Sequence, residues 1–179
     1  MKRLFLLRHA KASRDGPGIR DEDRALAERG REDAAHIGRF MNEEVYAADL
    51  ALCSTSARTR QTLELVLPQL TVQPTVQYLD ELYLASAEAI LALIRRTSDA
   101  TGSLMIVGHN PGLEECARSV VRPPSERRLR KRYETMTDKF PTGSLAAIDF
   151  DAERWSAIGG WVGELETFVR PKDLRDKDE

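Results

Sequence analysis

The sequence is poor in cysteine and has no long hydrophobic run. Its two cysteines, Cys53 and Cys116, form no Cys-x-x-Cys pair, and two thiols are too few to hold a domain together, so we expect both to be reduced. The apolar run from Leu4 to Leu7 is shorter than the roughly 7–15 residues of a secretory signal core. No run approaches the ~18 apolar residues of a membrane helix. These absences predict a cytoplasmic protein.

An excess of charge of either sign is also missing. The chain has 27 basic and 29 acidic residues, a net charge of −2, so we expect no general attraction to nucleic acid or to a membrane. One segment departs from this balance: residues 122–132 contain six cations. We expect a solvated loop there, and the alternative is that it guides an acidic phosphorylated substrate.

The length of 179 residues corresponds to one domain of ordinary size. We expect a single domain over residues 1–170 and a charged tail over residues 171–179. Within this tail, the run from Lys172 to Glu179 is expected to fray.

Short apolar runs alternate with segments of helical periodicity. The runs at residues 3–8, 50–53, 76–79 and 104–107 predict strands, and the segments between them predict helices. Ser144–Phe150 and Trp155–Val162 predict two further strands that pair as a hairpin. This order predicts an α/β three-layer sandwich, with a mostly parallel central sheet, helices on both faces and a C-terminal strand hairpin.

Three predicted strands lead into residues suited to phosphate chemistry. The first ends at Arg8 and His9, the second leads to Arg58, and the fourth leads to His109. Because the carboxyl ends of parallel strands share one edge of a sheet, these side chains are expected to meet. Two guanidinium groups can bind phosphate oxygens, and an imidazole can act as nucleophile. A single histidine after a strand is more often structural, and we read His36, on the flank of the first helix, in that way.

Three segments resemble the histidine phosphatase superfamily, which also contains the cofactor-dependent phosphoglycerate mutases. Leu6-Leu7-Arg8-His9-Ala10 resembles its Arg-His-Gly signature. Residues 54–62, STSARTRQT, are similar to its Ser-x-x-x-Arg-x-x-Gln-Thr segment. Residues 107–112, VGHNPG, are similar to its second-histidine segment in the form found in small SixA-type phosphohistidine phosphatases. The order of the segments matches, and the resemblance spans about residues 2–150.

The resemblance implies that His9 attacks phosphorus and forms a phosphohistidine intermediate, which water then hydrolyses. Arg8, Arg58 and His109 would bind the phosphate oxygens. No metal or other cofactor is expected, and the sequence shows no metal-ligand motif. The leading substrate class is phosphohistidine on proteins. The alternatives are a small-molecule phosphomonoesterase or mutase that uses the same site, and a phosphoprotein-binding module without turnover.

Two features depart from the family pattern or leave a role open. Ala10 stands where the family has glycine, so a positive φ is not expected there. Glu81 is the first candidate for the proton donor, because residues 80–83 fall where larger members carry a glutamate. The loop after His9 offers three alternatives: Asp15, Asp21 and Asp23. A good leaving group such as imidazole would hardly need a dedicated acid.

Overall fold

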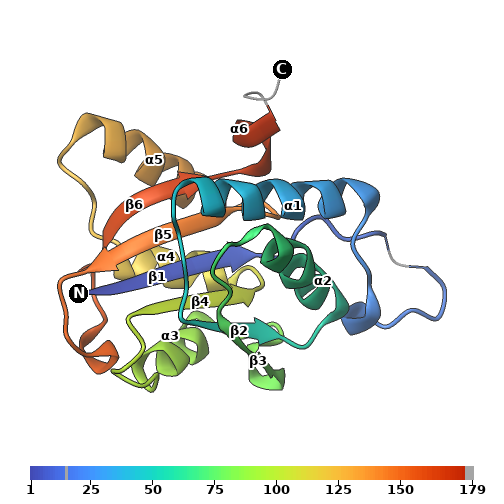
Figure 1. The fold of residues 1–179 in the computed structure, drawn as a ribbon, viewed down its shortest axis with the longest axis horizontal. Helices are drawn as coiled ribbons and strands as arrows, with labels where there is room; N and C mark the ends of the chain where they lie inside the picture. Colours follow the sequence, from blue (N-terminus) through green and yellow to red (C-terminus); the bar gives the residue numbers. More distant parts are fainter. Residues whose placement is uncertain (15, 176–179) are drawn as a thin grey trace.

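The computed structural model describes residues 1–14 and 16–175. Its centre is a six-stranded sheet with the order β3-β2-β4-β1-β5-β6 (Figure 1). The first four strands along the chain run parallel, whereas β5 is antiparallel to β1 and β6 is antiparallel to β5. The strands are β1 (Lys2–Arg8), β2 (Leu50–Ser54), β3 (Thr75–Leu79), β4 (Ser103–Gly108), β5 (Leu145–Phe150) and β6 (Glu164–Val169).

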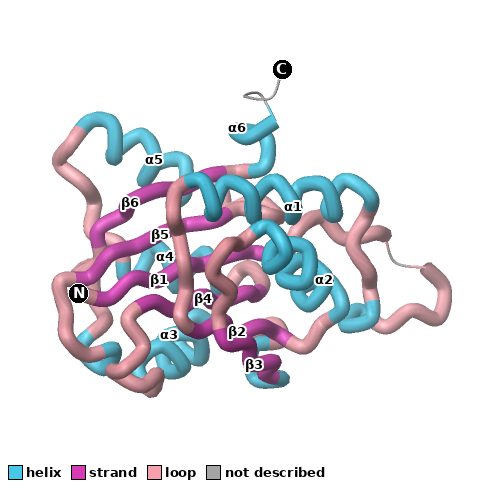
Figure 2. Tube along the Cα trace, viewed as in Figure 1, coloured by secondary structure: helices cyan, strands magenta, loops and turns pink. Residues whose placement is uncertain are grey.

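Helices cover both faces of this sheet (Figure 2). One buried cluster joins the sheet to α1, α2 and α6, and the other joins it to α3, α4 and α5. In β1, Phe5 and Leu7 belong to the first cluster, and Leu4 and Leu6 belong to the second, because successive side chains of a strand point to opposite faces. The helices are α1 (Glu28–Glu43), α2 (Ala57–Val66), α3 (Ala87–Arg95), α4 (Gly112–Val120), α5 (Arg127–Asp138) and α6 (Pro171–Arg175).

This architecture confirms the predicted α/β sandwich with its mostly parallel sheet. Serine caps fix the start of two helices, because a capping oxygen accepts a backbone N–H that the helix leaves unpaired. Ser56 accepts from the N–H of Thr59 at the start of α2, and Ser86 accepts from the N–H of Ala89 at the start of α3. None of the helices in the described ranges is long and apolar enough to cross a bilayer.

The C-terminal hairpin is present, but its second strand lies further along the chain than predicted. The predicted strand at Trp155–Val162 is wrong: β6 begins at Glu164, and Trp155–Ala157 forms a short 3-10 turn, η4. The Trp155 ring is fully buried, and its indole N–H donates to the carbonyl oxygen of Thr101 at 2.8 Å. Trp155 and Ile158 therefore pack in the core instead of pairing in the sheet.

Two charged segments are more ordered than expected. Much of the basic segment at 122–132, expected to be a loop, belongs to α5, which buries Met136. The described part of the segment expected to fray forms α6, in which Leu174 is 7% exposed and packs in the cluster with α1. Residues 176–179 lie outside the described part of the chain.

Candidate active site

The register of the sheet brings two histidines together. Arg8 on β1 pairs with Gly108 on β4, so the residues that follow, His9 and His109, leave neighbouring parallel strands at the same level. Their ring centroids are 5.3 Å apart. Both side chains lie in buried positions, with His9 8% and His109 2% exposed. The strand ends thus meet as the sequence predicts.

One hydrogen bond fixes the tautomer of His9. Its Nδ1 lies 2.7 Å from the carbonyl oxygen of Ala10. A carbonyl oxygen can only accept, so Nδ1 carries the hydrogen and the neutral ring keeps a lone pair on Nε2. Ala10, which replaces the family's glycine, is not among the residues with positive φ, and its N–H donates to Thr62 Oγ1 at 2.9 Å. This turn therefore holds His9 in a form that can act as a nucleophile through Nε2.

His109 takes the opposite tautomer. Arg58 Nη2 lies 3.4 Å from His109 Nδ1, and a guanidinium can only donate, so this nitrogen carries the lone pair. The Nε2–H then donates to Ser54 Oγ at 2.8 Å. Ser54 stands at the end of β2 as the first residue of the Ser-x-x-x-Arg segment. The site predicted from the sequence did not include Ser54, although its place in that segment was a usable signal.

The two arginines differ in how far their donors are occupied. Arg8 Nη1 donates to the carbonyl oxygen of Phe140 at 2.9 Å, but its buried Nε has no hydrogen-bond partner within the described ranges. Arg58 is 3% exposed, and it uses both ends of its fork on Asp21. Nη1 donates to the main-chain oxygen of Asp21 at 2.7 Å, and Nη2 donates to its carboxylate at 3.0 Å. Asp21 thus occupies the Arg58 fork in the free protein, through its main-chain oxygen at one end and its carboxylate at the other.

Asp21 and Tyr83 complete this cluster. Asp21 lies in η1 (Asp21–Asp23), and its carboxylate also accepts from the Tyr83 hydroxyl. The Tyr83 ring packs edge-on to His109 with centroids 5.5 Å apart, and it lies beneath the Arg58 guanidinium at 5.9 Å. Sequence reasoning missed Tyr83, because it is separated from both Asp21 and His109 along the chain. The contact arises only when the segment after β3 folds over the strand ends.

Burial and positive charge keep both imidazoles neutral. Burial is the main cause that lowers the pKa of His9 to about 4, with Arg8 and Arg58 acting in the same direction against the hydrogen bond to Ala10. Burial, His9 and Arg58 lower the pKa of His109 to about 3. The hydrogen bonds from Tyr83 and Arg58 lower the pKa of Asp21 to about 2. At neutral pH the site therefore combines two neutral rings with guanidinium charge, which suits binding of a phosphoryl anion.

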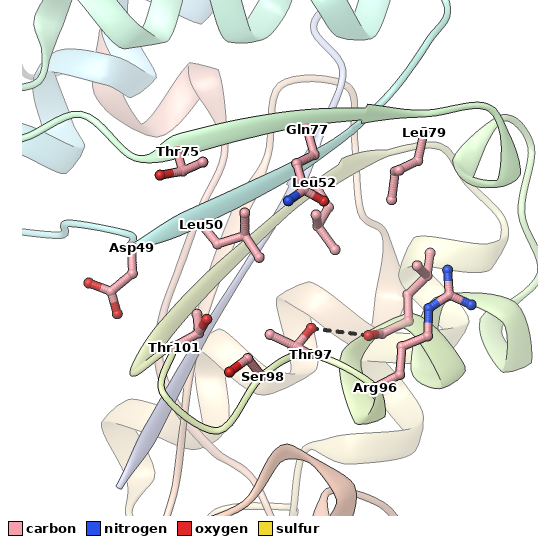
Figure 3. Close-up of a pocket in the computed structure, with 11 residues that line it drawn as sticks. Asp49, Leu50, Leu52, Thr75, Gln77, Leu79, Arg96, Thr97, Ser98 and Thr101 are labelled. Carbon is pink, nitrogen blue, oxygen red and sulfur yellow. Dashed lines mark hydrogen bonds between the residues drawn. The ribbon is translucent and has the colours of Figure 1, made fainter.

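The candidate proton donors lie in different places. Glu81, in η3 (Asp80–Leu82), forms an ion pair with Arg96. Arg96 lies on the wall of a cavity lined by residues of β2, β3, α3 and the loop after α3 (Figure 3). This cavity has a volume of about 450 Å³. Asp21, in contrast, directly contacts Arg58. Asp23 pairs with Arg20 at 2.8 Å, and Asp15 lies outside the described residues. Of these carboxylates, the structure brings Asp21 to the histidine pair.

The cysteines are poor alternatives as nucleophiles. Cys53 and Cys116 are free and buried, and burial raises the pKa of each thiol to about 12. A thiol with such a pKa is protonated at neutral pH and is a weak nucleophile. No group of three or more His, Cys, Asp or Glu side chains that could hold a metal ion occurs within residues 1–14 and 16–175.

Comparison with known proteins agrees with this geometry. The model of the histidine phosphatase superfamily (branch 1) matches residues 4–90. An uncharacterized protein of Mycobacterium leprae is 32% identical over 169 residues, which cover 93% of this chain and 100% of that protein.

Two solved structures are similar over nearly the whole chain. A candidate phosphohistidine phosphatase SixA from Agrobacterium tumefaciens is 33% identical with a TM-score of 0.77, covering 95% of this chain and 98% of that one. A candidate SixA from Nakamurella multipartitia is 29% identical with a TM-score of 0.79, covering 95% and 96%. The chain belongs to the histidine phosphatase superfamily, in its SixA-type branch.

Proposed function

We propose that this phosphatase transfers a phosphoryl group from its substrate to Nε2 of His9 and then to water, and that its substrates are proteins phosphorylated on histidine. The observation that carries the proposal is the state of His9. Its Nδ1–H is held by the carbonyl oxygen of Ala10, so the free lone pair is on Nε2, beside a second imidazole and guanidinium charge.

In the first step, the Nε2 lone pair of His9 forms a bond to phosphorus while the bond from phosphorus to the leaving group breaks. The leaving group takes that electron pair and a proton. Arg58 exchanges its contact with Asp21 for a contact with the phosphate oxygens, and the unpartnered Nε of Arg8 donates to another. These charge-assisted hydrogen bonds stabilise the transition state.

In the second step, a water oxygen attacks the phosphorus of phosphohistidine, and the N–P bond breaks. The electron pair returns to His9 Nε2, and the water proton leaves to solvent. His109 binds a phosphate oxygen after it takes up a proton at Nδ1, because a dianion beside the ring favours the imidazolium form. The products are inorganic phosphate and the neutral His9 of the starting state.

The proton for the leaving group comes from Asp21 in this proposal. Its low pKa reflects the hydrogen bonds from Tyr83 and Arg58, and the Arg58 contribution is lost when Arg58 turns to phosphate. The pKa of Asp21 then rises and the carboxyl can carry a proton. Glu81 is the alternative donor, and it would first have to leave Arg96.

Two observations favour phosphohistidine over other phosphorylated groups. An imidazole leaving group takes up a proton from solvent readily, whereas an alkyl ester must release an alkoxide unless an acid protonates its oxygen. Phosphohistidine therefore depends least on an acid that is ionised in the free protein. The Agrobacterium tumefaciens relative, a candidate phosphohistidine phosphatase, is 33% identical over nearly the full chain. Such proteins would meet the enzyme in the cytoplasm, where two free thiols are expected to stay reduced.

A substrate comparison tests the proposal. The purified protein is given one peptide phosphorylated on histidine, its phosphoserine and phosphotyrosine counterparts, and small phosphate monoesters, and kcat/KM is measured for each. We expect the highest value for phosphohistidine and no inhibition by EDTA, since guanidinium groups supply the positive charge. A higher value for a small monoester would favour a metabolite phosphatase. Transfer of phosphate to a second substrate would indicate a mutase, and binding without turnover would indicate a binding module.

A further inference from the structure

A second feature of the same sheet edge is a hollow of about 690 Å³ with a basic lining, which we name the basic groove. Its lining residues come from the start of α1, the end of α5, the segment after α5, and α6. Its lining includes two acidic residues, Asp33 and Asp138. Its cations come from separate segments: Lys11, Arg29, Lys139, Arg170, Lys172 and Arg175.

The basic groove adjoins the histidine site through the main chain. β1 ends, β5 begins and β6 ends at one edge of the sheet, because β5 and β6 run antiparallel as a pair next to β1. Lys11 is two residues beyond His9. On the other wall, the N–H of Gly143, next to the lining residue Thr142, donates to the carbonyl oxygen of His9 at 2.9 Å. A segment bound in the groove would therefore lie beside the phosphoryl site.

Three of the six cations, all of them arginines, are already paired with carboxylates within the protein. Arg170 forms an ion pair with Asp173 at 2.8 Å. Arg175 and Arg29 both contact the carboxylate of Asp33. The Arg175–Asp33 pair joins α6 to α1. Because all three guanidinium groups already contact carboxylates, they are less available to a ligand than an unpaired cation.

The three lysines are different. Lys11, Lys139 and Lys172 are exposed, and their side chains make no hydrogen bond or ion pair with any described residue. They come from the loop after β1, the end of α5 and α6. One lining carboxylate, Asp138, faces them without an ion-pair partner in the described part of the chain. The groove thus has an excess of available positive charge in a protein whose net charge is −2.

We propose that the basic groove binds an acidic stretch of the protein substrate, close in sequence to the phosphorylated residue. This inference rests on the proposed function and specifies its substrate class. Three ammonium groups on flexible stems and separate segments suit several carboxylates along an extended chain. A single phosphate would be held better by paired guanidinium forks, and the groove arginines are already engaged.

The test compares two matched peptides that carry phosphohistidine. One has glutamates on both sides of the phosphorylated residue, and the other has glutamines in the same places. We expect kcat/KM to be about tenfold higher for the glutamate peptide at low ionic strength, from two or three exposed charge pairs. The preference should shrink as salt is added, because exposed charges are screened.

A double variant assigns this preference to the groove. Lys139→Gln with Lys172→Gln should reduce the preference to about twofold or less, since only Lys11 of the free lysines remains. Arg39→Gln with Arg154→Gln changes the net charge equally at exposed positions outside the groove, and it should keep the preference. Hydrolysis of a small aryl phosphate by each variant serves as the reference rate, so that each effect is read as a ratio.

The outcomes separate the groove from the catalytic proposal. Equal kcat/KM for the two peptides with an active enzyme would overturn the groove proposal and leave the phosphatase mechanism standing. An equal loss of preference in the Arg39/Arg154 control would also overturn it, because it would indicate a general charge effect. Absence of turnover for both peptides and for the aryl phosphate would instead contradict the proposed function.

Discussion

In the proposed mechanism, different side chains at the strand ends bind the phosphoryl group and attack it. Arg58 supplies a planar fork that Asp21 occupies in the free protein, so a phosphoryl group finds the donors already aligned. The hydrogen bond from His9 Nδ1 to Ala10 and the one from His109 Nε2 to Ser54 orient the two rings without ionising them. The site is thus preorganised for an anion before the substrate arrives.

Replacing Arg58 by lysine tests the importance of this fork. Arg58→Lys keeps the positive charge but loses the bidentate geometry. We expect kcat/KM to fall by about 30- to 1000-fold, which corresponds to ~2–4 kcal/mol of transition-state stabilisation. Arg60→Lys is the matched control on the same helix, since Arg60 packs on Tyr78 and should leave the rate close to that of the wild type. Similar losses in both variants would indicate damage to α2 instead of loss of a phosphate contact.

The two neutral histidines also affect stability. In the unfolded chain each imidazole binds a proton near pH 6.5, but in the folded protein the pKa of His109 is about 3. The unfolded state therefore binds more protons between these values, and the free energy of unfolding decreases as the pH falls through this range. Each histidine contributes about 1 kcal/mol per pH unit between pH 6 and pH 5.

His109→Gln should reduce this dependence. The variant lacks one of the two buried imidazoles, so its free energy of unfolding should change less between pH 6 and pH 5, by about 1 kcal/mol per pH unit. Urea unfolding at several pH values measures both slopes. An unchanged slope would mean that His109 is protonated in the folded protein, contrary to its burial beside His9 and Arg58.

At the scale of elements, the strands that carry the site were predictable and the segments that close it were not. β1, β2 and β4 are buried on both faces, so each appears in the sequence as a continuous apolar run. Trp155 and Ile158 gave a similar signal but belong to a buried turn. α5 gave no signal, because its many charges conceal the one buried residue, Met136. Tertiary packing decides these cases, and a local pattern cannot report it.

The same reasoning explains which site residues were predicted. Arg8, His9, Arg58 and His109 follow strands whose order and direction could be inferred, so their meeting at one edge could be inferred too. The Asp21 contact with Arg58 depends on the path of the loop between β1 and α1. Loop paths have no period in the sequence, and several acidic residues of that loop were equally plausible.

The η1 and η3 segments offer competing proton donors, which substrates can distinguish. Asp21→Asn should slow hydrolysis of an alkyl phosphate by ~10²–10⁴-fold, the usual range for a general acid. An activated aryl phosphate and phosphohistidine should lose much less, because their leaving groups need less help. Glu81→Gln is the matched comparison and should have a small effect on all three substrates. A selective effect of Glu81→Gln on the alkyl phosphate would assign the acid to η3.

The first turn of α1 packs closely against the loop after His9. A methyl group on Gly30 would lie 2.1 Å from the carbonyl oxygen of Lys11. Replacing glycine by alanine in a helix ordinarily raises the free energy of unfolding by about 0.5–1 kcal/mol. A decrease instead would indicate a steric clash. Gly30→Ala should destabilise the protein by about 1–3 kcal/mol in urea unfolding and lower the phosphatase rate. A more stable variant would show that α1 and this loop are not in close contact.

For the molecule as a whole, the change of strand direction at β5 divides one sheet edge into two parts, each with its own proposed role. The parallel strands place the histidines and arginines, and the antiparallel pair places the basic groove beside them. Both parts lie at the carboxyl end of β1, where a folded protein could present a phosphorylated side chain and its neighbours together. All of these proposals depend on His9 as the residue that accepts the phosphoryl group.

Trapping the intermediate tests this central claim most directly. The enzyme is mixed briefly with a phosphohistidine peptide labelled on phosphate and quenched in alkali, which preserves phosphohistidine, and the labelled residue is mapped by mass spectrometry. We expect the label on His9 alone, and we expect His9→Ala to fold with similar thermal stability but to carry no label and show no turnover. A label on Cys53 or on any residue other than His9, or turnover by His9→Ala at the wild-type rate, would contradict the account.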